Sequence, residues 1–266
     1  MLTELLEWFL TPCPPAARRL GYLHEAIAIR ARYRRHQHLW QPHLQATRAF
    51  VERAALATTS KKCAVVLGSG ALYDVPIELL AEAYDRVELV DLVHPREARR
   101  AASRLRNVKL RTEDISGAVA TLGDLERNTE TTPILAPPLA FSKETDFVLS
   151  ANLLSQLPEI PYNWLTNRKI VPEPACRNFG ATIVRRHLNL LSNCDCPVAL
   201  VTDVERCYVE PDGSLQAAWD SLYGFTLPQG KGSWYWEVAP PGEVHPDLAV
   251  RMTVRAFDYF EGTQLA

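Results

Sequence analysis

The chain has no long uninterrupted apolar run. No stretch of about 18 apolar residues occurs, and a membrane-crossing helix needs that length. The first segment carries Glu4 and Glu7 inside its apolar stretch, whereas a secretory signal starts with basic residues and continues with an unbroken apolar core. These absences predict a chain without a transmembrane segment and a cytoplasmic location.

The chain also lacks a large excess of charge of one sign, and it lacks the two cysteine pairs of a typical zinc site. The formal net charge is -2, so no overall field draws the protein towards nucleic acid or an anionic membrane. Six cysteines are present, and Cys194 and Cys196 form an isolated C-x-C without a second pair. We therefore expect no metal site and a reducing compartment.

The residues that are present favour one large α/β core. The chain has 266 residues, of which 47% are hydrophobic, enough for one core and a smaller appendage. From residue 61 onwards, short apolar strands alternate with helical patterns, which is typical of a parallel sheet with right-handed crossovers. The segments 233–240 and 249–259 are rich in β-branched and aromatic residues, and predict an antiparallel pair at the sheet edge.

Residues 1–60 predict a helical N-terminal extension, and residues 61–266 predict the α/β domain. We expect the extension to be broken near Pro42 and to form a lid, a substrate contact or an oligomer contact. Within the α/β domain, the pattern predicts a long loop from Pro158 to Pro174 and a short helix around 215–222.

The most informative motif joins the first strand of the α/β domain to its helix. Gly68, Ser69 and Gly70 follow the apolar strand 64–67, and the lack of side chains on the glycines lets a ligand approach the backbone. Asp91 ends the next strand, about 20 residues after Gly70, the spacing at which an acid can accept hydrogen bonds from ribose hydroxyls. The motif predicts a nucleotide-type ligand at the carboxyl edge of the sheet.

Five strand–helix units followed by a β-hairpin resemble the class I S-adenosylmethionine-dependent methyltransferases over roughly residues 63–260. The resemblance implies a Rossmann-like methyltransferase fold with a mostly parallel seven-stranded sheet, and S-adenosylmethionine as cofactor. It also implies a role for each of several positions. These are Gly68, Ser69 and Gly70 at the methionine part, Asp91 at the ribose, Asp114 and Ile115 near the adenine, and Asn152 facing the methyl group and the acceptor.

The chain departs from the family pattern on its first strand. Val66 stands where family members usually carry an acid, and Leu72 replaces the third glycine of the loop. Asp74 lies near the same turn and could replace some of the lost polar contacts. Asp114 could equally cap the helix that follows it.

A hydroxyl acceptor would need a general base. His94, His187 and His245 are candidates, each more often a packed or surface residue than a base. Tyr162 and Trp164 lie in the predicted loop past strand four, where their rings could contact an acceptor with an apolar or planar part.

The favoured function is methyl transfer to a small-molecule or lipid-like acceptor. One alternative is methylation of RNA or protein, with the basic helix Arg30–Arg35 as docking surface. A second is a non-catalytic protein that keeps the fold. A third is an NAD-dependent oxidoreductase, disfavoured because Tyr73 stands where the dinucleotide fingerprint needs a glycine. A homo-oligomer is compatible with all of these.

Overall fold

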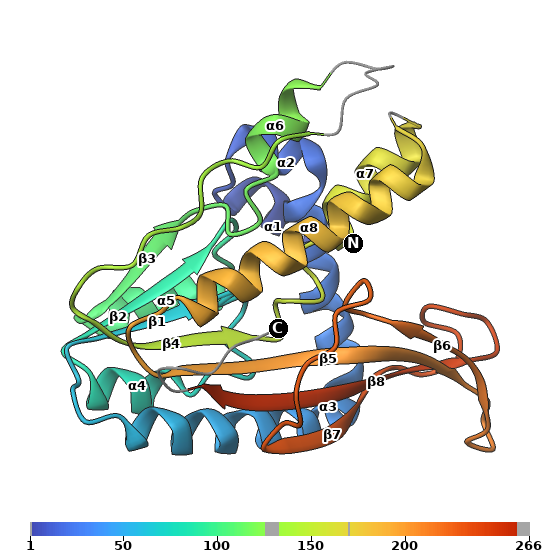
Figure 1. The fold of residues 1–266 in the computed structure, drawn as a ribbon. Coiled ribbons are helices and arrows are strands. Elements are labelled where there is room, and N and C mark those ends of the chain that lie inside the picture. The colour runs from blue at the N-terminus through green and yellow to red at the C-terminus, as the bar shows by residue number, and fades with distance from the viewer. Residues whose placement is uncertain (1, 126–132, 170, 260–266) are drawn as a thin grey trace.

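The computed structural model describes residues 2–125, 133–169 and 171–259 (Figure 1). Within these ranges, none of the helices combines the length and the apolar character needed to cross a membrane.

A mostly parallel sheet forms the centre of the molecule. Its main path runs β3-β2-β1-β4-β5-β8-β7, and β6 pairs with β5 off this path. The first five strands are parallel, whereas β8 is antiparallel to both β5 and β7. The strands are β1 Cys63–Leu67, β2 Arg86–Asp91, β3 Val108–Thr112, β4 Thr145–Ala151, β5 Val198–Val209, β6 Leu215–Asp220, β7 Gly232–Ala239 and β8 Ala249–Tyr259.

Helices cover both faces of the sheet, with α3 below it and α7 and α8 above it in the view of Figure 1. The helices are α1 Leu2–Leu10, α2 Pro15–Leu20, α3 Tyr22–Ala57, α4 Ile77–Ala83, α5 Arg96–Arg104, α6 Val119–Asp124, α7 Glu159–Arg168 and α8 Glu173–Ser192. This arrangement confirms the predicted mostly parallel α/β sheet with a helical N-terminal segment and a C-terminal antiparallel pair, and β6 makes it an eight-stranded sheet instead of the predicted seven-stranded one.

The alternation of side chains along β1 supplies both apolar layers. All five residues of β1 are buried. Ala64 and Val66 belong to the apolar core between the sheet and α3, α4 and α5. Val65 and Leu67 belong to the apolar core between the sheet and α8. A strand buried on both faces explains why β1 reads as an unbroken apolar run.

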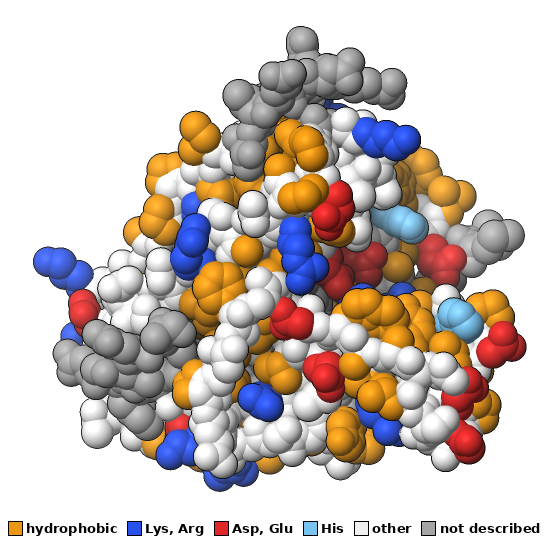
Figure 2. Space-filling view, turned by 45° about the vertical axis from the view of Figure 1, so that its right-hand side comes forward, with side chains coloured by type: hydrophobic (Ala, Val, Ile, Leu, Met, Phe, Trp, Pro, Cys, Tyr) orange, Lys and Arg blue, Asp and Glu red, His pale blue; other side chains and the backbone are white. Residues whose placement is uncertain are grey.

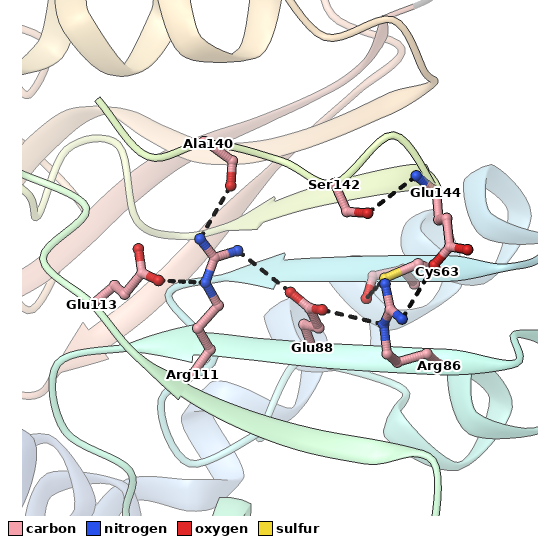
Figure 3. Close-up of polar contacts among 9 residues, drawn as sticks. Cys63, Arg86, Glu88, Arg111, Glu113, Ala140, Ser142 and Glu144 are labelled. Atoms are coloured by element: carbon pink, nitrogen blue, oxygen red, sulfur yellow. Dashed lines mark hydrogen bonds and ion pairs between the residues drawn. The ribbon is translucent and has the colours of Figure 1, made fainter. Parts of the chain in front are cut away.

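Ion pairs made by strand residues hold the outer part of the upper face of the sheet (Figure 3). Glu88 on β2 accepts from Arg86 at 3.2 Å and from Arg111 on β3 at 3.4 Å. Arg111 also donates to the carbonyl of Ala140 at 3.1 Å, and Arg86 pairs with Glu144 at 3.3 Å. These contacts attach the connection before β4 to the strands beside it.

The structure corrects three local predictions. Helix α7 occupies most of the predicted loop from Pro158 to Pro174, because Leu165 and its neighbours bury an apolar face against the α8 layer. Residues 215–220 form strand β6, not a helix, since they pair with the extended second half of β5. Helix α3 continues through Pro42, and its backbone departs from helical geometry at His36 instead.

The N-terminal extension packs directly on the sheet. Trp40, Leu44, Phe50 and Val51 on α3 belong to the same core as the strand residues beneath them. The division into 1–60 and 61–266 stays a prediction.

Candidate functional site

The turn after β1 holds three left-handed positions, at alternate residues, within five residues. Gly68 has φ 72°, Gly70 has φ 48° and Leu72 has φ 61°. The Gly68 N–H donates to the carbonyl of Val90 at 3.0 Å, which ties the turn to β2. A Cβ at Gly68 would lie 2.8–3.0 Å from side-chain atoms of Leu153, so glycine is required there by contact as well as by φ.

Asp91 closes this turn from the end of β2. Its Oδ2 accepts from the Gly70 N–H at 2.9 Å, and its Oδ1 accepts from the Leu92 N–H at 2.7 Å. Burial raises the pKa of Asp91, while the hydrogen bond from Gly70 and the neighbouring His94 act in the opposite direction. The carboxylate therefore keeps part of its accepting capacity free beside the glycine turn.

Asp114 follows β3 and begins the turn into α6. Its Oδ2 accepts from the Val119 N–H at 2.7 Å and its Oδ1 accepts from the Ser116 hydroxyl at 2.5 Å. The carboxylate thus serves the start of α6 in the way a helix cap does. Asp114 and the buried Ile115 also line the cavity described below.

Asn152 directly follows β4 and has a left-handed conformation with φ 48°. Its backbone N–H donates to Val201 at 2.8 Å. Its side-chain amide nitrogen lies 2.5 Å from Asp74 Oδ2 and 3.3 Å from His43 Nε2. The end of β4 is therefore joined both to the turn after β1 and to helix α3.

These groups meet in a cavity of about 400 Å³ at the carboxyl edge of the parallel strands, the edge where open α/β sheets bind ligands. We call its two parts the loop half and the aromatic half. The loop half is formed by Gly68, Ser69, Gly70, Asp91, Asp114, Ile115, Asn152 and Leu153. The aromatic half is formed by Ile29, Trp40, His43, Leu44, Tyr208, Trp236, Val238, Val250 and Met252.

The cavity lining is acidic. Its acids are Glu25, Asp74, Asp91, Glu113, Asp114 and Glu159, and its basic residues are Arg30, Arg32 and Arg206. The arginines are already engaged, since Arg30 pairs with Glu97 at 2.6 Å and Arg206 pairs with Glu159 at 2.6 Å. Within the described residues, Asp74, Asp91 and Asp114 have no ion-pair partner. Figure 2 turns this side towards the viewer, and acidic side chains lie in a recess near its centre.

The aromatic half is packed around His43. The His43 ring stacks on Trp236 with centroids 4.3 Å apart, and Trp40 meets Trp236 edge-on at 4.9 Å. The Trp40 indole donates to the carbonyl of Val238 at 3.0 Å. These contacts fix the planar faces of several rings around an apolar space.

None of the three candidate histidines from the sequence is among the cavity-lining residues. His187 is buried on α8 and bonds to Ser150 at 2.8 Å, and burial lowers its pKa to about 3. His94 is buried beside Asp91, and burial lowers its pKa. His245 accepts the backbone N–H groups of Asp247 and Leu248, which holds the β7–β8 connection.

Tyr162 and Trp164 lie on α7 and are likewise outside the cavity lining. The Tyr162 hydroxyl donates to Glu173 at 3.1 Å. The Arg168 guanidinium lies over the Trp164 ring, with its carbon 4.6 Å from the ring centroid. Glu159, Ile160 and Asn163 of the same helix line the cavity instead.

The four arginines of the basic helix Arg30–Arg35 are all ion-paired within the molecule. Arg30 pairs with Glu7 and Glu97, and Arg34 pairs with Glu7 at 3.3 Å. Arg35 and Arg32 both approach Glu243, the latter at 3.8 Å. These acids come from α1, α5 and the β7–β8 connection, so the arginines link the N-terminal extension to the rest of the fold.

Sequence reasoning missed His43, Trp40 and Trp236 as cavity residues. Trp40, His43 and Leu44 share the i, i+3, i+4 spacing of one helix face, which was a signal that they point in a common direction. Nothing local shows that this face meets the strands of the C-terminal hairpin.

No family model matches the sequence, and no curated protein matches it. Among solved structures, the chain is similar to DhpI in complex with SAH, with 18% identity over 87% of this chain and 95% of DhpI, at a TM-score of 0.33. It is similar to the 1,6-didemethyltoxoflavin-N1-methyltransferase of Burkholderia thailandensis, with 16% identity over 88% of this chain and 90% of that one, at a TM-score of 0.33. The 23S rRNA methyltransferase ErmE has 11% identity over 82% of this chain and 70% of its own, at 0.28. This likeness is distant and carries neither ligand nor reaction over to the chain.

Proposed function

We propose that the protein is an S-adenosylmethionine-dependent methyltransferase that acts on a small-molecule or lipid-like acceptor. The observation that carries the proposal is the hydrogen bond of 2.9 Å between Asp91 and the Gly70 N–H. It places a carboxylate against a glycine turn at the carboxyl edge of the sheet, as a ligand with an adenosyl group requires.

The residues of the loop half fit such a cofactor. The open backbone at Gly68, Ser69 and Gly70 suits the methionine part, and the accepting oxygens of Asp91 suit ribose hydroxyls. Asp114 and Ile115 would lie near the adenine, and Asn152 would lie at the end where transfer occurs. When bound, S-adenosylmethionine supplies a methyl group activated by its sulfonium.

The charge of the cavity supports a cationic ligand. Asp91 and Asp114 lie in the cavity without an arginine or lysine in ion-pair range among the described residues. A buried carboxylate without a counter-charge is unfavourable, and a sulfonium would provide that counter-charge. An anionic dinucleotide would meet the same carboxylates unfavourably, which weighs against the NAD alternative.

The aromatic half supports a small or lipid-like acceptor. Its walls are apolar and its rings are fixed by mutual contacts. Such walls exclude water and hold an acceptor in line with the methyl group, and this positioning is the main contribution an enzyme makes to this reaction.

Calorimetric titration tests the proposal. We expect S-adenosylmethionine and S-adenosylhomocysteine to bind with one-to-one stoichiometry and NAD not to bind. Binding of NAD alone, or of none of the three, would contradict the proposed function. Binding of both adenosyl compounds without methyl transfer to any acceptor in a cell extract would favour the non-catalytic alternative.

A further inference from the structure

Four side chains from four parts of the fold form a polar chain along the boundary between the two halves of the cavity. The Trp234 indole on β7 donates to His43 Nδ1 at 3.0 Å. His43 Nε2 on α3 lies 3.3 Å from the Asn152 amide at the end of β4. The same amide atom lies 2.5 Å from Asp74 Oδ2, in the connection between β1 and α4.

Proton counting fixes the state of His43. The indole of Trp234 is only a donor, so His43 Nδ1 must accept. Burial lowers the pKa of His43 to about 3, which leaves the ring neutral near pH 7. A neutral imidazole has one acceptor nitrogen, so the hydrogen is on Nε2 and points at the Asn152 amide.

The hydrogen on His43 Nε2 needs a hydrogen-bond acceptor. Two N–H donors cannot form a hydrogen bond with each other, and the oxygen and nitrogen of an amide are assigned from their partners. The Asn152 carbonyl oxygen therefore faces His43 Nε2, and the same oxygen then faces Asp74 Oδ2.

Two oxygens in contact must share a proton. The Asn152 amide atom and Asp74 Oδ2 lie 2.5 Å apart, which is hydrogen-bond contact. In this arrangement Asp74 carries the proton and donates it to Asn152. When Asp74 loses the proton, the amide must rotate by half a turn to offer its N–H, which breaks its bond with His43.

The surroundings of Asp74 agree with a carboxyl group that exchanges a proton. Burial is the larger effect and raises the pKa of Asp74. The charged group that faces it among the described residues is Arg48 on α3, which lowers the pKa. His43, on the same helix, is the titratable group beyond Asn152.

We propose that Asp74 accepts the proton of a neutral hydroxyl or N–H group on a planar, apolar acceptor, with Asn152 and His43 as positioning residues. The inference rests on the proposed function and names the acceptor chemistry of the same site. Asp74 contacts Asn152 of the loop half, and it lines the same cavity as the rings of Trp40 and Trp236.

Charge balances in this step. The O–H or N–H bond of the acceptor breaks, and its proton passes to a carboxylate oxygen of Asp74. The electron pair left on the acceptor atom forms the bond to the methyl carbon, while the methyl–sulfur bond breaks and its electrons stay on sulfur. The positive charge of the sulfonium and the negative charge of Asp74 disappear together, which favours the step in a cavity with little water.

The first test follows the Asp74 carboxyl by carbon NMR in protein labelled at the aspartate side chains and saturated with S-adenosylhomocysteine. The resonance that disappears in Asp74→Asn identifies the group. We expect its titration midpoint above the value of about 3.9 for free aspartate. In Trp234→Phe, His43 Nδ1 is free to carry the hydrogen and Nε2 can accept from Asn152, so the midpoint should fall. Tyr235→Phe, an exposed neighbour on the same strand, should leave it unchanged.

The second test measures binding of 2-naphthol and 2-methoxynaphthalene to the same complex by tryptophan fluorescence. Because a hydrogen bond to a charged group contributes about 1.5–3 kcal/mol, wild type should prefer 2-naphthol by about 10–100-fold. The preference should disappear in Asp74→Ala and as pH falls below the NMR midpoint, where Asp74 is protonated. Asp85→Asn, outside the cavity, should retain it.

The outcomes separate this inference from the proposed function. If S-adenosylhomocysteine does not bind, both fail. Suppose that S-adenosylhomocysteine binds. The inference alone is then overturned by any one of three results: neither naphthalene binds, wild type shows no preference for 2-naphthol, or the titration midpoint of Asp74 is not raised. A loss of tenfold or more in S-adenosylhomocysteine affinity in Asp74→Asn would also overturn it, because Asp74 would then be a cofactor ligand.

Discussion

The two halves of the cavity are built in different ways. The loop half comes from the ends of neighbouring parallel strands, and the Asp91–Gly70 contact spans only 21 residues. The aromatic half joins α3 to the C-terminal hairpin, and the His43–Trp234 bond spans 191 residues. Changes in the loop half should therefore act on cofactor binding, whereas changes in the aromatic half should act on packing and on the acceptor.

The largest effect is expected at Gly68. Alanine there would place its Cβ 2.8–3.0 Å from Leu153 at φ 72°, which combines overpacking with left-handed strain, roughly 2–5 kcal/mol in total. Gly70→Ala, with its nearest atom at 3.9 Å, should cost only the strain, about 1–2 kcal/mol. Urea unfolding measures both, and equal losses would show that contact with Leu153 does not matter.

Asp91→Ala tests the role of the loop half in cofactor binding. We expect S-adenosylhomocysteine affinity to fall by about 10–100-fold, because each hydrogen bond to the carboxylate contributes about 1.5–3 kcal/mol. Val244→Ala, on the hairpin side of the cavity, should leave this affinity unchanged. Calorimetric titration measures the affinity of both variants for S-adenosylhomocysteine. An equal loss of affinity in both would show that the two halves of the cavity do not differ in cofactor binding.

Trp40→Phe should affect stability and leave cofactor binding intact. The buried indole donates to Val238, which lies at the irregularity between Glu237 and Ala239 in the β7–β8 pairing. Leaving that carbonyl without its donor should cost about 1–3 kcal/mol of unfolding free energy. Trp219→Phe, on an exposed ring of β6, is the matched control with little expected change. A loss of S-adenosylhomocysteine affinity in Trp40→Phe would speak against the assignment of Trp40 to the acceptor side.

The smallest effect concerns the ion pairs that hold the β7–β8 connection to α3. The hydrogen bond from Arg35, supported by His36, lowers the pKa of Glu243 from 4.5 to about 2. Because the folded pKa is the lower one, the stabilisation is fully present above pH 4.5 and is lost as pH falls through about 2.

Glu243→Gln should therefore reduce stability at pH 7 by less than about 1 kcal/mol, and the difference from wild type should shrink below pH 4.5. Unfolding measured between pH 2 and pH 7 checks this, with Asp247→Asn in the same connection as control. A difference that stays constant over this range would exclude the ion pairs as its cause.

Local pattern was enough to find the loop half. Gly68, Gly70 and Asp91 follow apolar strands whose parallel pairing brings their ends to one edge, and the structure brings these residues together. The same rules failed for α7, whose apolar face packs into a core assembled from segments far apart in the chain. They also failed for β6, a largely exposed strand that forms a hairpin with the end of β5 just before it. Periodicity alone could not indicate those partners.

The α/β architecture, the glycine turn and the acid beside it could be predicted from the amino-acid sequence, because each depends on residues close in the chain or on the regular alternation of strands and helices. The meeting of His43, Trp234 and Asp74 through Asn152 became visible only in the folded chain. That meeting depends on how α3 crosses the hairpin strands, and packing of apolar faces over long sequence separations sets this crossing.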